Sequence, residues 1–207
     1  HRQDSNGAVV FTSGGYGQEW YGDVYELGAQ VVETMRSEGY ETYEVKWPGE
    51  NGWATENLRQ GFKKMMCATD EVVRWIQADL ADNPGVMGAT GQSGGALQLV
   101  YGLAVYGLES FLDVVVLSGG PITADLAELC YETSRLGGFV DRVMGWEGNG
   151  DYCRNSEGPE WTVEALQRES TVRTLPDEVR DFDYPDTPVV VIEGELDFYA
   201  SRGRIFY

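Results

Sequence analysis

The chain has 207 residues, 42% of them hydrophobic and 12% aromatic, which is enough for one domain with a substantial core and too little for two. Its 34 aspartates and glutamates outnumber its 15 lysines and arginines, and the resulting net charge of −19 makes nucleic acids and anionic membranes poor partners. No run approaches the roughly 20 consecutive apolar residues of a membrane-spanning helix, so we expect no membrane span.

The first predicted elements alternate between strand and helix. A β-branched apolar run predicts a buried strand over 8–12, and the glycine-rich stretch 13–17 predicts a loop behind it. Apolar residues at helical spacing predict a helix over 24–37, which Gly39 ends. A second apolar and aromatic run predicts a strand over 42–47. The order is therefore strand, helix, strand, with short loops between them.

The same alternation continues through the middle of the chain and returns after a gap. The pattern predicts, in order, a helix over 67–82, a strand over 85–90, a buried helix over 93–107, and strands over 112–120 and 188–194. Strands separated by helices predict an α/β fold whose sheet is mostly parallel and is flanked by helices on both faces.

The alternation breaks over 121–186, where glycines and acidic residues separate weak helical segments. We expect this stretch to be a cap inserted over the end of the sheet, within a single domain that spans 1–207. Cys130 and Cys153 are the better pair for a possible disulfide, whereas Cys67 falls in a predicted helix as a buried thiol. A disulfide would favour a secreted protein over a cytoplasmic one, and without it the location is open. A metal site is not expected, because no C-x-x-C pair or histidine accompanies the cysteines.

A short motif in the middle of the chain carries the chemistry. Residues 91–95 read Gly-Gln-Ser-Gly-Gly, a match to G-x-S-x-G, and stand between a predicted strand and a predicted helix. In that context Ser93 is a candidate nucleophile, exposed at a helix N-terminus whose dipole favours developing negative charge. A tight strand-to-helix turn with an incidental serine is the alternative. Gln92, just before the serine, is expected either to pack there or to hydrogen-bond neighbouring loops at the site.

With this motif in this context, nearly the whole chain resembles the α/β-hydrolase family, in which the nucleophile follows the fifth strand and the loop after the third strand supplies part of the oxyanion hole. The corresponding loop here reads Ser-Gly-Gly-Tyr-Gly, and its Gly-Tyr resembles that of cutinase-like polyesterases. The resemblance implies that the backbone amides of Tyr16 and Gly94 hold the oxyanion, with Gly15 beside them and the Tyr16 ring lining the acyl pocket. A plain glycine turn at Gly14 and Gly15 is the alternative.

The family's triad acid lies in the loop after the seventh strand, which corresponds here to the last predicted strand. The resemblance implies Asp197 as the acid, with Glu195 and Glu193 as weaker competitors. Such a carboxylate orients a histidine and stabilises its imidazolium. The only histidine in the chain is His1, on the wrong side for the family's order, so the catalytic histidine is expected beyond Tyr207 and the chain is expected to lack family parts at both ends.

Three tryptophans, Trp20, Trp47 and Trp53, follow predicted strand ends on the side where the site should open. They form either an aromatic wall for the substrate or part of the core. Aromatic side chains serve both purposes, so residue type alone does not choose between them.

Together these features predict a serine hydrolase that cleaves a small-molecule or polymeric carboxylic ester through an acyl-enzyme on Ser93. No cofactor or metal is expected to take part. Substrate class follows from the resemblance alone, so thioesterase, peptidase and polyester hydrolase activities stay open, as does the oligomeric state. A non-catalytic binding protein of the same fold, without the histidine, is the alternative. A flavodoxin-like phosphate binder is a weaker one, because no P-loop or nearby lysine accompanies the glycine-rich loops.

Overall fold

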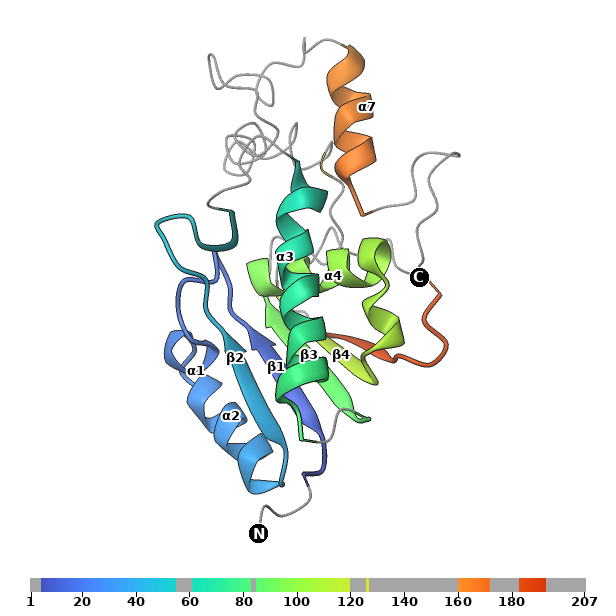
Figure 1. Cartoon of the computed structure of the whole chain (residues 1–207). Helices are drawn as coiled ribbons and strands as arrows, with labels where there is room; N and C mark the ends of the chain where they lie inside the picture. The colour runs from blue at the N-terminus through green and yellow to red at the C-terminus, as the bar shows by residue number, and fades with distance from the viewer. Residues whose placement is uncertain are drawn as a thin grey trace.

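The structure, a computed structural model, describes residues 5–54, 61–82, 85–119, 126, 160–171 and 183–192. This described part forms one sheet of five parallel strands in the order β2-β1-β3-β4-β5 (Figure 1). The strands are β1 (Ala8–Thr12), β2 (Glu41–Val45), β3 (Met87–Gln92), β4 (Val114–Ser118) and β5 (Val189–Ile192). The expected α/β fold with a mostly parallel sheet is confirmed.

Four helices of this described part flank the sheet, namely α1 (Tyr21–Val24), α2 (Gly28–Ser37), α3 (Phe62–Trp75) and α4 (Gly94–Tyr106), with a π-helical turn at Ile76–Leu80 and 3-10 turns at Gly52–Ala54 and Leu108–Ser110. A further helix, α7 (Glu160–Glu169), lies beyond the end of the sheet (Figure 1). The connection from β1 to β2 runs across the sheet in one direction, and the connection from β2 to β3 runs back across it in the opposite direction. Because such crossovers are right-handed, α2 and α3 lie on opposite faces. α4 packs beside α3 and over β1, β3 and β4 (Figure 1).

Two helices differ from their predicted bounds. The helix predicted over 24–37 is divided into α1 and α2, because Tyr25 has an extended backbone (φ −111°, ψ 138°). Gly28 donates its N–H to the Tyr25 carbonyl at 2.8 Å and thereby closes the turn between the two helices. The helix predicted from residue 67 begins earlier, because the apolar face of α3 starts with Phe62, which is fully buried.

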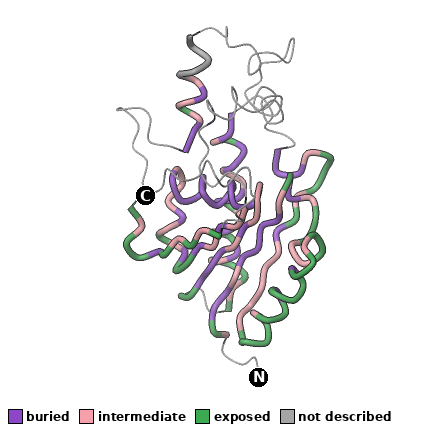
Figure 2. Tube along the Cα trace, turned by 180° about the vertical axis from the view of Figure 1, so that it is seen from behind, coloured by how far each residue is buried: buried purple, intermediate pink, exposed green. Residues whose placement is uncertain are grey.

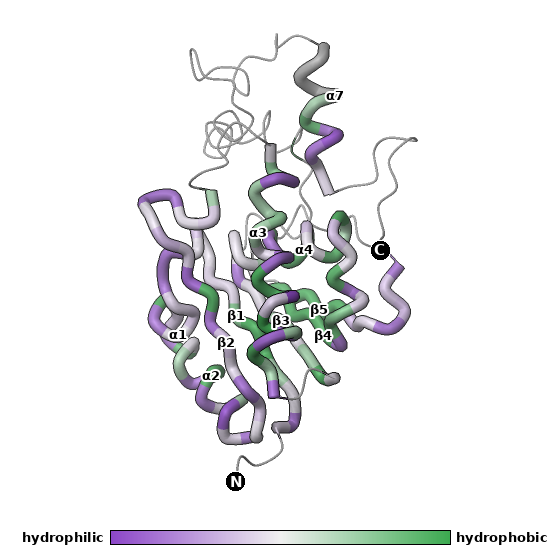
Figure 3. The backbone as a smooth tube through the Cα atoms, in the orientation of Figure 1, coloured by the Kyte–Doolittle hydropathy of each residue, from purple (hydrophilic) through white to green (hydrophobic). Residues whose placement is uncertain are grey.

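Two groups of buried residues form the core. Figure 2 marks the buried residues along the Cα trace. The first lies between the sheet and the helices α3 and α4, and includes the alternate strand residues Val115 and Leu117. The second joins α3 and α4 to α7 and includes Tyr101 and Leu166, both fully buried. Figure 3 shows the central strands as hydrophobic, whereas β2, which reads Glu-Thr-Tyr-Glu-Val, is mixed. Each fully buried large apolar side chain contributes about 1.5–3 kcal/mol, so these two groups hold the layers together.

The described parts of the predicted cap, 121–186, are attached to α4 and to each other. The Tyr101 hydroxyl on α4 donates to the carbonyl of Glu169, at the end of α7, at 2.6 Å. The Leu126 N–H donates to the Ser170 hydroxyl at 2.9 Å. The assignment of this region as a cap, and of 1–207 as one domain, stays a prediction.

One row of paired residues crosses the sheet near its carboxyl edge. From β2 to β5 the row joins Val45, Thr12, Gly91, Leu117 and Val191. The loops that follow these strands therefore leave the sheet along the same edge, where ligands bind in open α/β folds.

Candidate active site

Ser93 stands on a strained turn between β3 and α4. Its backbone has φ 53° and ψ −115°, and within the described ranges it is the one residue other than glycine with a positive φ. Holding an L-residue in such a conformation costs about 1–3 kcal/mol and requires surroundings that over-determine it. A serine held this way between a strand and a helix is the arrangement that the G-x-S-x-G motif predicts for a nucleophile.

Backbone crowding explains the glycines of the motif. A Cβ on Gly94 would lie 2.1 Å from the carbonyl oxygen of Gly15, and a Cβ on Gly95 would lie 2.3 Å from that of Thr12. On the other side of the serine, a Cβ on Gly91 would lie 2.6 Å from the carbonyl group of Gly95. Side chains at these positions would push the first turn of α4 away from β1, so close packing of the turn requires glycine.

Hydrogen bonds fasten the Ser93 turn to the neighbouring strands. The Ser93 N–H lies 3.0 Å from the carbonyl oxygen of Ser118 and 2.8 Å from that of Gly119. Gly119 donates its own N–H to the Ile192 carbonyl at 3.0 Å, so the ends of β3, β4 and β5 are linked in one row. Because the Ser93 N–H is used here, the N–H groups that α4 offers at its first turn begin with Gly94.

The glycine-rich loop after β1 lies against this turn. A Cβ on Gly14 would be 3.2 Å from the Cβ of Ser93 and 2.5 Å from Oε1 of Gln92. The loop is closed by the Gly17 N–H, which donates to the Gly14 carbonyl at 3.0 Å, and Gly15 has φ 59°, a value that favours glycine. The structure therefore brings the predicted oxyanion loop and the predicted nucleophile together.

Two tryptophans from the segment after β2 hold the carbonyl groups of this loop. The Trp53 indole donates Nε1–H to the Gly15 carbonyl at 3.0 Å, and the Trp53 backbone N–H donates to the Tyr16 carbonyl at 3.1 Å. The Trp47 N–H donates to the Gly17 carbonyl at 2.8 Å. These bonds fix the loop before any substrate binds, and oxyanion stabilisation requires donors preorganised in this way.

The three tryptophans have different settings. Trp53 is 6% exposed in the second core group, so the core alternative is confirmed for it. Trp47 is half-buried, and its indole N–H donates to Gln98. Trp20 is 44% exposed, with the Lys46 ammonium 5.4 Å from its ring centroid. Only Trp47 and Trp53 touch the loop beside Ser93 through the bonds described above.

Gln98, a fully buried side chain one turn into α4, organises the same region. Its Oε1 accepts hydrogen bonds from the Trp47 indole at 3.0 Å and from the Thr69 hydroxyl of α3 at 2.7 Å. Its Nε2 donates to the Gly94 carbonyl at 3.2 Å. Sequence reasoning assigned this residue no role, although a polar residue inside a buried helix signals a hydrogen-bonded position.

Tyr25 is a second residue that sequence reasoning missed. Its hydroxyl accepts the Gly14 N–H at 2.7 Å and donates to Oε1 of Gln92 at 2.5 Å. Of its two alternatives, Gln92 therefore makes a hydrogen bond to a neighbouring loop, the one between α1 and α2. Burial raises the pKa of Tyr25, the Gly14 N–H opposes this shift and the nearby Tyr21 adds to it. The helical spacing placed Tyr25 inside one long helix, and only the break between α1 and α2 turns its side chain to the site.

The predicted site residues fall into two groups. Ser93, Gly94, Gly15, Tyr16 and Gln92 come together at the carboxyl edge of the sheet. The others lie outside the described residues: Asp197, Glu193, Glu195, His1, Cys130 and Cys153. The triad acid, the histidine and the disulfide therefore stay predictions.

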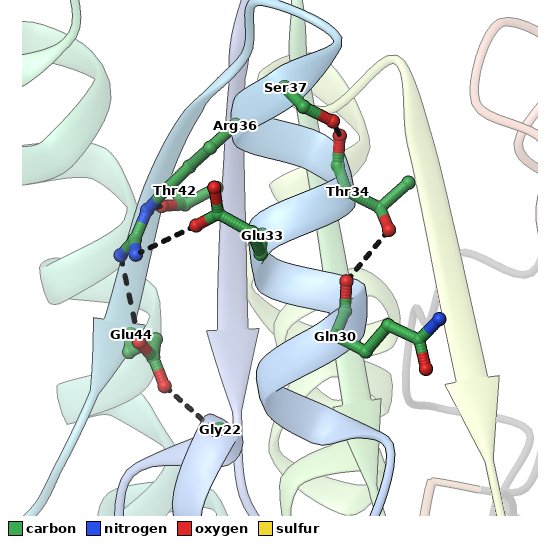
Figure 4. Close-up of polar contacts among 8 residues, drawn as sticks. All are labelled: Gly22, Gln30, Glu33, Thr34, Arg36, Ser37, Thr42 and Glu44. Atoms are coloured by element: carbon green, nitrogen blue, oxygen red, sulfur yellow. Dashed lines mark hydrogen bonds and ion pairs between the residues drawn. The ribbon is translucent and has the colours of Figure 1, made fainter.

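A separate surface hollow of about 610 Å³ lies between α2 and β2, and none of the residues of the strained turn lines it. Figure 4 shows the polar contacts beside it. Arg36 crosses this hollow: its Nε donates to the Thr42 hydroxyl at 2.8 Å, and its guanidinium lies 3.9 Å from the carboxylates of Glu33 and Glu44. Glu44 also accepts the Gly22 N–H at 2.8 Å. Such exposed ion pairs contribute about 0–1 kcal/mol each, and of the two only Arg36–Glu44 connects α2 to β2.

Metal-ligating side chains and Cys67 are further reactive groups within the described ranges. No three histidine, cysteine, aspartate or glutamate side chains of these ranges gather as a metal site would need, and no helix there is long and apolar enough to cross a bilayer. Cys67 is partly exposed rather than buried as expected, and its Sγ lies 3.6 Å from Oε1 of Glu71. Desolvation and the Glu71 carboxylate raise the pKa of this thiol, whereas a nucleophilic cysteine needs a lowered one.

No protein-family model and no curated protein sequence matches the chain, but solved structures resemble it. A protein from Silicibacter sp. that is assigned as a thioesterase has a TM-score of 0.58 at 16% identity, over 99% of this chain and 63% of that one. Esterase 2 from Thermogutta terrifontis, phosphonylated by sarin, has a TM-score of 0.54 at 16% identity, over 100% and 68%. An inhibited esterase B from Lactobacillus rhamnosis has a TM-score of 0.55 at 14% identity, over 99% and 62%.

These likenesses show that the chain has the α/β-hydrolase fold, which solved esterases share. The chain spans 63% of the length of the Silicibacter protein and 62% of that of the Lactobacillus esterase. At 14–16% identity the likeness concerns the fold, and one fold hosts many reactions. The reaction therefore depends on the residues of the site and not on the fold.

Proposed function

We propose that Ser93 is the nucleophile of a serine hydrolase that cleaves carboxylic esters. The observation that carries this proposal is the strained serine (φ 53°) at the start of α4, with the loop of Gly15 and Tyr16 packed beside it. A strained backbone on a non-glycine residue is costly and is concentrated at functional sites. Esters are preferred as substrates because two solved structures of the same fold are esterases.

In the proposed reaction, Ser93 Oγ attacks the ester carbonyl carbon, and the carbonyl oxygen becomes an oxyanion held by the backbone amides of Tyr16 and Gly94. Asp197 orients a histidine that takes the serine proton and passes it to the leaving alcohol. Water then attacks the acyl-enzyme with the histidine as base, and the carboxylic acid is released. No step requires a cofactor or a metal.

The position of β5 supports Asp197 as the acid. The Ser93 N–H donates to the Gly119 carbonyl, and the Gly119 N–H donates to the carbonyl of Ile192, the last residue of β5. The chain therefore leaves the sheet at Ile192 on the same edge as the serine turn, and Asp197 follows shortly afterwards in the sequence. The proposed histidine follows Asp197 in the order of the family, and His1 is not assigned to it.

The experiment is to react the protein that contains this chain with a fluorophosphonate and to measure its intact mass. We expect a single adduct that is lost in Ser93→Ala and kept in Ser37→Ala, since Ser37 is an exposed serine on α2. Hydrolysis of p-nitrophenyl butyrate should disappear in the same variant. The reagent class is apt because an esterase of this fold is phosphonylated by sarin.

The outcomes separate the two readings of the site. An adduct on Ser93 together with ester turnover supports the hydrolase, and a thioester substrate assayed in parallel tests the activity assigned to the Silicibacter protein. A protein that takes no adduct and hydrolyses neither substrate overturns the proposal. In that case the non-catalytic binding protein is the better account, because the fold would be present without a working base.

A further inference from the structure

Tyr25 joins the two halves of the candidate site. We propose that Tyr25 is a positioning residue that sets the distance between the oxyanion loop and the nucleophile turn, an inference that rests on the proposed function. Its hydroxyl accepts the N–H of Gly14, in the loop, at 2.7 Å and donates to Oε1 of Gln92, next to Ser93, at 2.5 Å. One hydroxyl therefore bridges the segment after β1 and the turn after β3.

The direction of the two hydrogen bonds follows from the chemistry of the three groups. A phenol has one hydrogen and two lone pairs, and a backbone N–H can only donate. The Gly14 N–H therefore takes a lone pair of Tyr25, and the phenol hydrogen goes to the amide oxygen of Gln92. An ordinary tyrosine ionises only near pH 10, and burial raises the pKa of Tyr25 further, so the hydroxyl has the hydrogen that this bridge needs at neutral pH.

Aromatic packing fixes the ring that carries this hydroxyl. Tyr25 directly follows α1 and has an extended backbone, and its ring meets that of Tyr21 edge-on with 5.0 Å between centroids. The Tyr21 ring lies 5.1 Å from that of Phe11, a fully buried residue of β1. The hydroxyl is thus anchored to the sheet through a row of three rings.

The interface that the bridge closes has no spare room. A Cβ on Gly14 would lie 2.5 Å from Oε1 of Gln92, 2.9 Å from the Tyr25 hydroxyl oxygen and 3.2 Å from the Cβ of Ser93. Without the hydroxyl, the Gly14 N–H and the Gln92 oxygen lose this shared partner, and the loop that carries Tyr16 loses its hydrogen-bonded link to Gln92, the residue before Ser93. Oxyanion donors act only at about 2.7–3.1 Å from the oxyanion, so a small displacement of the loop lowers the rate.

The test compares Tyr25→Phe with Tyr21→Phe. Both substitutions keep the ring and remove one hydroxyl, but among the described residues only the Tyr25 hydroxyl, and not that of Tyr21, is hydrogen-bonded to Gly14 and Gln92. Removing a whole oxyanion donor costs about 10²–10³ in kcat, so a displaced donor should cost about 10- to 100-fold. We expect Tyr25→Phe to lower kcat for p-nitrophenyl butyrate and the rate of Ser93 phosphonylation by about that factor. Tyr21→Phe should stay within about twofold of the wild type.

The division between kcat and KM identifies a positioning role. A donor that acts on the oxyanion contributes to the transition state and not to substrate binding, so KM should change by less than about threefold in Tyr25→Phe. Gln92→Leu removes the other end of the same bridge and should have a similar effect. Because the two changes break one interaction, kcat of the double variant should lie within about twofold of kcat of the slower single variant.

Each outcome decides the inference. A wild-type protein that neither labels at Ser93 nor hydrolyses the ester overturns the proposed function, and this inference with it. A working wild type whose Tyr25→Phe variant labels and turns over at the same rate overturns this inference alone. If Tyr25→Phe does not fold, Gln92→Leu decides in the same way. The double variant gives a further test. If its reduction in kcat equals the product of the two single reductions, the inference is also overturned, because the two side chains then act independently and not through one shared hydrogen bond.

Discussion

The carbonyl oxygen of Gly15 lies so close to Gly94 that a Cβ on Gly94 would be 2.1 Å away from it. This contact joins the loop after β1 to the first turn of α4, where the amides of the proposed oxyanion hole are found. The same carbonyl accepts the indole N–H of Trp53 at 3.0 Å, so it cannot turn aside without losing a hydrogen bond. The loop and the helix therefore fit together only while residue 94 is glycine.

We expect Gly94→Ala to lower esterase activity by at least about tenfold, because the methyl group displaces the Gly15 loop and misplaced catalytic groups cost up to about 100-fold. Overpacking should also lower the free energy of unfolding by about 1–3 kcal/mol. Urea denaturation and phosphonylation rates measure the two effects. Gly107→Ala, at the other end of α4, is the control: its φ of 73° costs about 1 kcal/mol, but no backbone atom obstructs a side chain there. Full activity in Gly94→Ala would contradict the expectation.

The strain at Ser93 should be measurable as stability. Ser93→Gly relieves a conformation that costs about 1–3 kcal/mol in an L-residue and loses about 0.5–1 kcal/mol through the freer unfolded chain. We therefore expect Ser93→Gly to be about 1 kcal/mol more stable than Ser93→Ala in urea denaturation, with both variants unreactive toward fluorophosphonate.

Ser37 provides the matched comparison for that measurement. Ser37 is the last residue of the helix α2, where glycine is worse than alanine by up to about 1 kcal/mol, so Ser37→Gly should be less stable than Ser37→Ala. The glycine variant should therefore be the more stable of the two at position 93 and the less stable of the two at position 37. The same order at both positions would show that Ser93 stores no strain.

Removing the Gln98 side-chain amide should destabilise the fold. Gln98→Leu leaves the Thr69 hydroxyl and the Trp47 indole without their acceptor, and an unsatisfied buried group costs about 1–3 kcal/mol. Thr69→Val removes one donor and keeps the Gln98 amide, so it should lower the free energy of unfolding by less than Gln98→Leu does. Urea denaturation of both variants tests this, and a Gln98→Leu variant at least as stable as Thr69→Val would refute it.

Stability should fall at alkaline pH through the half-buried Tyr106. Burial is the largest cause that raises the pKa of Tyr106, whose hydroxyl donates to the Lys63 carbonyl. An unfolded tyrosine ionises near pH 10, so the stabilisation is fully present below that pH and is lost above it, where the unfolded state releases its proton first. The free energy of unfolding should therefore decline above about pH 10 in the wild type and less steeply in Tyr106→Phe. Urea denaturation at a series of pH values measures this decline. An equally steep decline in the wild type and in Tyr106→Phe would exclude Tyr106 as a cause.

Part of the site could be predicted from the sequence because it depends on local pattern. The G-x-S-x-G motif between a strand and a helix located Ser93, and the glycine-rich loop located Gly15 and Tyr16, since turns and strand ends leave signatures in neighbouring residues. Gln98 and Tyr25 could not be assigned in this way. Their partners, Thr69 and Gly14 among them, are distant in sequence or lie across a helix break, so no local pattern connects them.

The sequence by itself determined the alternation of strands and helices, the parallel sheet and the serine turn, because apolar periodicity and glycine placement act over a few residues at a time. Only the tertiary structure decided that Tyr25 and Gln98 hydrogen-bond to the segments around Ser93 and that Trp53 holds the loop after β1. These relationships depend on where separate segments meet, and that is set by packing of the whole core. A hydrogen bond between such segments exists only once the layers have come together.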